Sequence, residues 1–116
     1  MYQPLKGEPL NALHGAYQIF AVASNSLRKH RYSYGICSAL HSAHHKHGVG
    51  SSNAYMIAFR VMKDFRPMSY ESDYREGFWW QPPSNRDKAS YQARQNALAM
   101  SQAIVLDAIH AKTKVL

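Results

Sequence analysis

Residues 84–112 decide the fold, and they read SNRDKASYQARQNALAMSQAIVLDAIHAK, without a glycine or a proline. Ser84 is followed three residues later by Asp87, a spacing that matches the box in which two side chains accept backbone N–H groups at the start of a helix. Alanine, leucine, glutamine and methionine, which all favour helices, dominate the interior of the stretch. We therefore predict one long helix over residues 85–112.

The apolar residues of this helix fall into two stripes. The first consists of Tyr91, Leu98, Val105 and Ile109, and the second of Ala97, Met100, Ile104 and Ala108. A helix on the surface of a domain buries one apolar face, so two stripes indicate neighbours on more than one side. We expect this helix to lie at the centre of the domain, with the others packed around it.

Three shorter helices are expected before it. The first begins near Pro9 or Asn11, ends in residues 28–31, and has a stripe at alternating spacings of three and four: Leu10, Leu13, Tyr17, Phe20, Ser24 and Leu27. Gly15 lies inside this helix at a cost of about 1 kcal/mol relative to alanine, so a neighbour is expected to pack closely there. The second helix covers residues 34–46 after a Ser33 cap. The third covers residues 54–65 after a cap from Ser51, Ser52 or Asn53.

The chain is thus predicted to be all-α, a compact single-domain bundle of four main helices over residues 1–116. Residues 1–8 form an N-terminal arm. Residues 66–83 form a long aromatic loop before the last helix. Irregular connections of this length in a compact domain are usually functional or pack as a small unit of their own.

The composition indicates which cellular compartment and which kinds of partner to expect. Fourteen Lys and Arg against seven Asp and Glu give a formal charge of +7, which favours an acidic partner, either nucleic acid or an acidic protein surface. The apolar runs are too short to span a bilayer. The N-terminus lacks the apolar core of a secretion signal, and the single Cys37 has no partner for an internal disulfide. We expect a cytoplasmic protein that does not enter membranes.

The aromatic loop is the first candidate for a partner-binding site. It contains Trp79 and Trp80, with Tyr74 and Arg75 close by in the sequence, and Trp, Tyr and Arg supply most of the energetic centres of protein interfaces. Basic residues at the end of the first helix, Arg28, Lys29 and Arg31, would steer an acidic partner to it. Two alternatives stay open: the loop closes one end of the core, or it is a homodimer contact.

The alternative hypothesis is a nucleic-acid-binding regulator that uses a helix-turn-helix-like pair over residues 34–65. Ser52 and Asn53 would then meet base edges, and Arg60 and Lys63 would contact phosphates. Such DNA-binding units usually have Ala-x-x-x-Gly-Val-Ser across the turn. In this chain Ala43 stands five residues before Gly48, and Gly50 intrudes before Ser51.

The histidines are the remaining candidates for chemistry. His41 and His45 are four residues apart, the spacing of zinc-binding helices, but Ser42 stands where metalloproteases have glutamate, and no carboxylate lies nearby in sequence. Cys37 lies on an apolar face, as core cysteines do. We predict no cofactor and no enzymatic activity, and we assign no metal site. Metal binding by His41 and His45 stays open as an alternative.

Several short motifs carry a resemblance. Residues 34–40 read YGICSAL, Arg66-Pro67 follows the third helix, and Trp79-Trp80-Gln81-Pro82 precedes Arg94-x-x-Ala97-Leu98 in the last. Over residues 33–106 the chain resembles small helical proteins encoded by bacteriophages and prophages. The resemblance implies a host-takeover factor, such as an anti-CRISPR or other anti-defence protein. Such a protein would bind a host defence complex in the bacterial cytoplasm and block it by occupying a surface.

Overall fold

The computed structural model describes residues 3–31, 33–64 and 88–114. Their elements are the short 3₁₀ helix η1 (Gln3–Leu5), α1 (Leu10–Lys29), α2 (Ile36–His41), the π-helical turn η2 (Ser42–Lys46), α3 (Ser52–Asp64) and α5 (Lys88–Lys114). Since η2 continues α2 directly, these residues contain four main helical segments and no strand. The predicted all-α bundle is confirmed. The aromatic loop and the Ser84–Asp87 cap lie outside the described residues.

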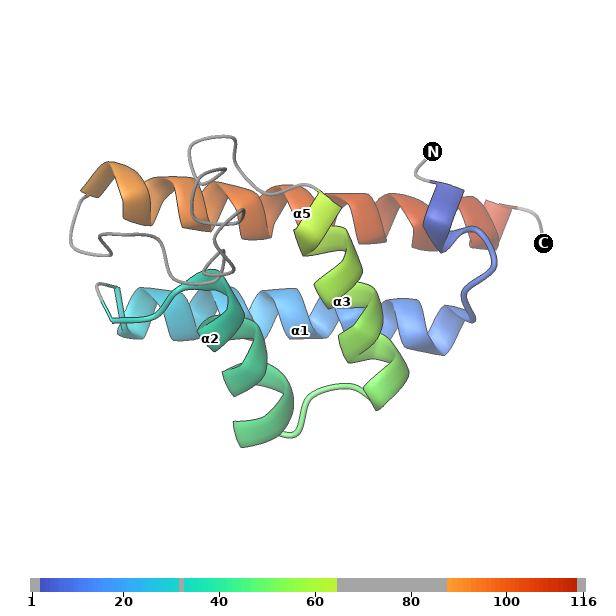
Figure 1. Ribbon diagram of the computed structural model, residues 1–116. Helices are drawn as coiled ribbons and strands as arrows, with labels where there is room; N and C mark the ends of the chain where they lie inside the picture. Colours follow the sequence, from blue (N-terminus) through green and yellow to red (C-terminus); the bar gives the residue numbers. More distant parts are fainter. Residues whose placement is uncertain (1–2, 32, 65–87, 115–116) are drawn as a thin grey trace.

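Helices α1 and α5 run antiparallel along the long dimension of the molecule (Figure 1). Two amides on α5 tie them together: Nε2 of Gln95 donates to the carbonyl of Ser24 at 3.3 Å, and Nε2 of Gln102 donates to the carbonyl of Tyr17 at 3.5 Å. The core on this side includes the buried side chains of Leu13, Phe20, Leu27, Leu98 and Val105.

Helices α2, η2 and α3 form a second layer that crosses α1 (Figure 1). The closest approach is at Gly15, where an added Cβ would lie 2.7 Å from the Cβ of Ala54. Gly50 packs into the same junction with a φ of +76°, a conformation that favours glycine. The close neighbour expected at Gly15 is therefore the start of α3.

Among the described residues, most of the packing between helices involves α1, whereas the two stripes led us to expect the C-terminal helix at the centre. The small residues of α1, Ala12, Gly15, Ala16 and Ala23, let neighbours approach from several sides. On α5 the first stripe is buried or half-buried, but Met100 of the second is 53% exposed. The second stripe therefore overstated how much of α5 is covered.

Arg94 is the buried side chain that the hydrophobic pattern did not anticipate. It is 0% exposed on α5, and its Nη1 donates to the backbone carbonyls of Arg31, at 3.2 Å, and of Tyr34. Arg94 therefore holds the connection between α1 and α2 against α5.

The helix boundaries differ from the sequence expectation mainly at α2. Its first helical residue is Ile36 and its N-cap is Gly35, without a side-chain cap. The N–H groups of Ser33 and Tyr34 both donate to the carbonyl of His30 at 3.0 Å, so these residues still belong to the turn that ends α1. At α3 the expected serine cap is present, because Oγ of Ser51 accepts from the N–H of Ala54 at 3.1 Å.

Replacing Arg94 by methionine should destabilise the domain by about 2–4 kcal/mol, because two carbonyl groups lose their donor inside the protein. The matched change Arg60→Met, at an arginine side chain that is 44% exposed, should cost less than about 1 kcal/mol. Urea unfolding followed by circular dichroism measures both. Equal losses for the two variants would contradict the role given to Arg94.

The substitution Gly15→Ala should destabilise the domain by about 1–3 kcal/mol through overpacking, although alanine in a helix is normally favoured over glycine by about 1 kcal/mol. In the double variant Gly15→Ala/Ala54→Gly the clashing methyl is gone, so the double variant should lose less than the sum of the two single changes. Thermal and urea unfolding of the parent chain, the two single variants and the double variant give the coupling free energy between the two positions. Additive losses would mean that the two residues are not in contact.

Candidate functional site

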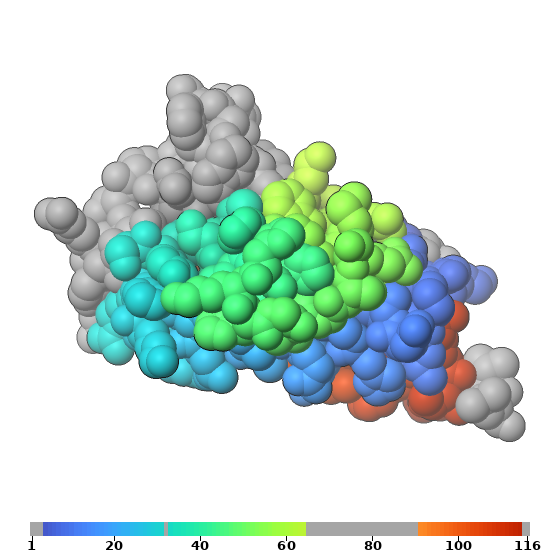
Figure 2. Space-filling view, turned by 90° about the horizontal axis from the view of Figure 1, so that it is seen from below, coloured from blue at the N-terminus to red at the C-terminus, as the bar shows by residue number. Residues whose placement is uncertain are grey.

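The first half of the chain contains a long segment that has basic residues and no acidic ones. Residues 9–63 contain no Asp or Glu, and their Lys, Arg and His residues are Arg28, Lys29, Arg31, Lys46, Arg60, Lys63, His14, His30, His41, His44, His45 and His47. This segment supplies α1, α2, η2 and all of α3 except its last residue. Figure 2 looks at the face where α2, η2 and α3 lie next to one another. These helices therefore present a surface with cations whose one carboxylate is Asp64 at the end of α3.

A hollow of about 400 Å³ opens at the basic end of α1. Its lining consists of Val22, Asn25, Ser26, Arg28, Lys29 and His47. Arg28 is held in place locally, because its guanidinium donates to Oδ1 of Asn25. His47 comes from the residue that follows η2, which packs against α1. We call this feature the basic hollow. Two cationic side chains and an imidazole on a concave surface favour an anionic ligand.

The three basic residues expected to steer a partner do not act as one group. Arg28 and Lys29 line the basic hollow. Arg31 instead has its guanidinium carbon 4.8 Å from the centre of the Tyr91 ring on α5, in a cation–π contact. Arg31 therefore serves the packing between α1 and α5 as well as the surface charge. Tyr74, Arg75, Trp79 and Trp80 lie outside the described residues, so their part in a site stays a prediction.

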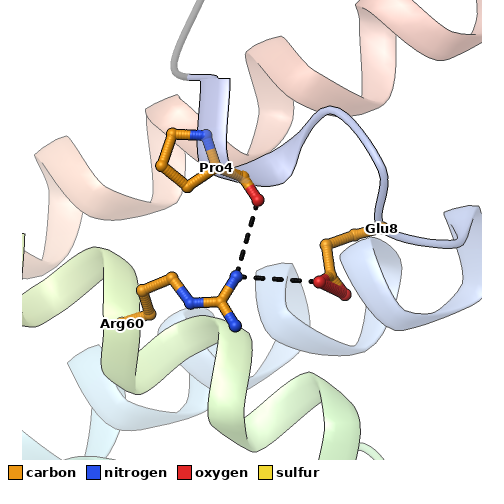
Figure 3. A network of polar contacts seen from close by, with 3 residues as sticks. All are labelled: Pro4, Glu8 and Arg60. Atoms are coloured by element: carbon orange, nitrogen blue, oxygen red, sulfur yellow. Dashed lines mark hydrogen bonds and ion pairs between the residues drawn. The ribbon is translucent and has the colours of Figure 1, made fainter.

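The helix-turn-helix residues lie at opposite ends of α3. Ser52 and Asn53 are exposed in its first turn, and Lys63 is exposed in its last, about 16 Å further along the axis. Arg60 is engaged by the N-terminal segment: its Nη1 lies 3.6 Å from Oε1 of Glu8 and donates to the carbonyl of Pro4 at 3.5 Å (Figure 3). A DNA phosphate would compete with the Glu8 carboxylate for Arg60.

The histidines of α2 and η2 form a contiguous cluster with Tyr55 of α3. The rings of His41 and His45 are 4.4 Å apart between centroids, and those of His44 and His45 are 4.6 Å apart. His44 stacks on Tyr55 at 4.6 Å with 10° between the planes. The Nδ1 atom of His44 is 2.8 Å from the carbonyl oxygen of Val49. Because a carbonyl only accepts, Nδ1 of His44 carries a proton.

The electrostatics of the cluster follow from its crowding. Loss of hydration, followed by the neighbouring rings of His41 and His44, lowers the pKa of His45 below its usual value. Burial raises the pKa of the Tyr55 hydroxyl, and the nearby Cys37 adds to the effect. Burial alone raises the pKa of the Cys37 thiol. In the described ranges no three His, Cys, Asp or Glu side chains are arranged to hold a metal ion.

Sequence reasoning did not find the basic hollow or the contact between the histidines and Tyr55. The missing carboxylates of residues 9–63 were visible in the sequence and could have indicated the charged face. The position of His47 in the lining of the hollow depends on how η2 packs against α1, which no local pattern specifies.

No family model, curated protein or solved structure matches this chain. Among the described helices, none is both long and apolar enough to cross a membrane.

The Cys37 thiol should be a weak nucleophile, because burial raises its pKa. The alkylation rate with iodoacetamide should rise at higher pH in the folded chain than in the same chain unfolded in urea. By linkage, the fold keeps its full stability below the ordinary pKa of 9.0, where the thiol is protonated in both states. It loses stability as the pH rises from there through the raised folded-state pKa, because the unfolded chain ionises more readily. A folded-state midpoint at or below that of the unfolded chain would contradict the burial of this thiol.

Proposed function

We propose that the chain is a non-enzymatic inhibitor that binds an acidic surface of a host defence complex, of the CRISPR type or another, and blocks it by occupying that surface. The observation that carries the proposal is the basic hollow on a face whose helices contribute no carboxylate except Asp64. The resemblance to small phage-encoded proteins supplies the class of target and the cytoplasm of a bacterial host as the place of action.

The charge distribution supports binding by electrostatic complementarity. Cations on one face raise the rate of encounter with an acidic partner and disfavour basic competitors. Arg28 adds a planar guanidinium that can bind a carboxylate or a phosphate through two hydrogen bonds. In this proposal Trp79 and Trp80 supply apolar anchors in addition to the charged contacts, and Tyr74 and Arg75 are further partner-binding residues.

The structure gives less support to a nucleic-acid-binding regulator. Ser52, Asn53 and Lys63 are exposed, but Arg60 is engaged by Glu8 and by the carbonyl of Pro4. Nucleic acid remains an outcome of the experiment that follows. Binding through several phosphates would weaken by orders of magnitude between about 50 and 200 mM salt.

The test begins with recovery of partners from a nuclease-treated bacterial lysate, followed by an activity assay of the purified defence complex so obtained. The double variant Arg28→Glu/Lys29→Glu should bind this complex at least about tenfold more weakly and should lose inhibition in proportion. Lys6→Glu/Lys114→Glu is the matched control. It changes the net charge by the same amount. Lys6 directly follows η1 and Lys114 is the last residue of α5, and Figure 1 shows η1 and the end of α5 at the opposite end of the molecule from the end of α1. The control should bind within about twofold of the parent chain.

Three results would contradict the proposal. The first is equal weakening by both double variants, which would reflect net charge alone. The second is recovery of nucleic acid without protein from an untreated lysate, which would make the regulator the working model. The third is recovery of this chain only with itself, which would indicate a homodimer contact.

A further inference from the structure

The histidine cluster contains a pair of side chains with the spacing and exposure of a metal chelate. His41 is the last residue of α2 and His45 lies in η2, four residues later. Both are exposed, and their ring centroids are 4.4 Å apart with 37° between the planes. We propose that His41 and His45 together bind one divalent transition-metal ion, with water in the remaining coordination positions.

The distances suit two imidazole ligands. Metal–nitrogen bonds of about 2.0–2.1 Å place the two nitrogens about 3 Å apart. Rings that already touch reach this separation by small rotations of exposed side chains. Two histidines four apart on one helical face are the arrangement that zinc-binding helices use. Within this pair the metal would join the end of α2 to the π-helical turn that follows it.

The neighbouring histidine has a different role. His44 is fixed by the contact of its Nδ1 with the carbonyl of Val49 and by its stack on Tyr55. In the described part of the chain no three ligand side chains converge on one point. The described residues therefore give the site two protein ligands, and His44 orders the turn beside them without binding the ion.

The chemistry of the ligands selects the ion. Imidazole nitrogen suits Zn²⁺, Cu²⁺ and Ni²⁺. Ca²⁺ and Mg²⁺ require oxygen ligands, and residues 9–63 contain no carboxylate. The surrounding cations oppose any divalent ion, so the affinity is expected to be moderate. This inference does not depend on the proposed inhibitor function, because it rests on side chains outside the basic hollow.

The test uses the full chain without a polyhistidine tag, treated with chelator and then titrated calorimetrically with Zn²⁺. One equivalent should bind. His41→Gln and His45→Gln should each weaken binding at least about tenfold, because a single imidazole does not chelate. His14→Gln, at an exposed histidine of α1, is the matched control and should stay within about twofold. Electron paramagnetic resonance with Cu²⁺ should show two coordinating nitrogens.

Three results would overturn the proposal. The first is absence of binding up to about 1 mM Zn²⁺, because two imidazoles that chelate one ion should bind it more tightly than this. Loss of binding in His44→Gln as large as in His41→Gln, with both chains folded by circular dichroism, would also overturn it. Equal binding by the parent chain and by His45→Gln would show that the ion lies elsewhere.

Discussion

The structure depends on the packing of α1 against neighbours on several sides at once. A helix in this position needs small residues wherever another backbone approaches, and α1 has Gly15 opposite Ala54 at the tightest point. The contact fixes where α3 begins, and the turn through Gly50 carries the chain from η2 into it. On the far side α5 closes the core along the length of α1, so stability and surface geometry both follow from one helix.

This packing also creates the surface features that could bind a partner. Arg94 holds the connection after α1 by donating to the carbonyls of Arg31 and Tyr34, which directs the chain into α2. The following turn η2 then packs against α1 and brings His47 into the lining of the basic hollow, together with Arg28 and Lys29. The same turn presents the histidine cluster to Tyr55. The shape of the cationic face therefore depends on the connection between α1 and α2. Its charge depends on the sequence of residues 9–63.

Much of the fold was predictable because amphipathic periodicity and glycine positions are local signals. The stripe from Leu13 to Leu27 and the close approach at Gly15 were both found in this way. The sequence analysis overestimated how much of α5 is covered, because its second apolar stripe included Met100, which is exposed. Arg94 and Ser101 lie in register with Leu98 and Val105 at spacings of three and four, and both are buried. A periodicity search restricted to apolar residues passes over them, since buried arginine is rare. The basic hollow and the stack of His44 on Tyr55 could be found only in the tertiary structure, because their residues come from different parts of the chain.

Native-state hydrogen exchange of the whole domain tests the central position of α1 most directly. Amides in the buried middle of α1, around Ala16 and Phe20, should exchange most slowly and only through global unfolding. Their exchange free energy should equal the free energy of unfolding obtained from urea. Faster exchange in α1 than in α5, through openings that leave α5 protected, would show that the domain is organised around its C-terminal helix instead.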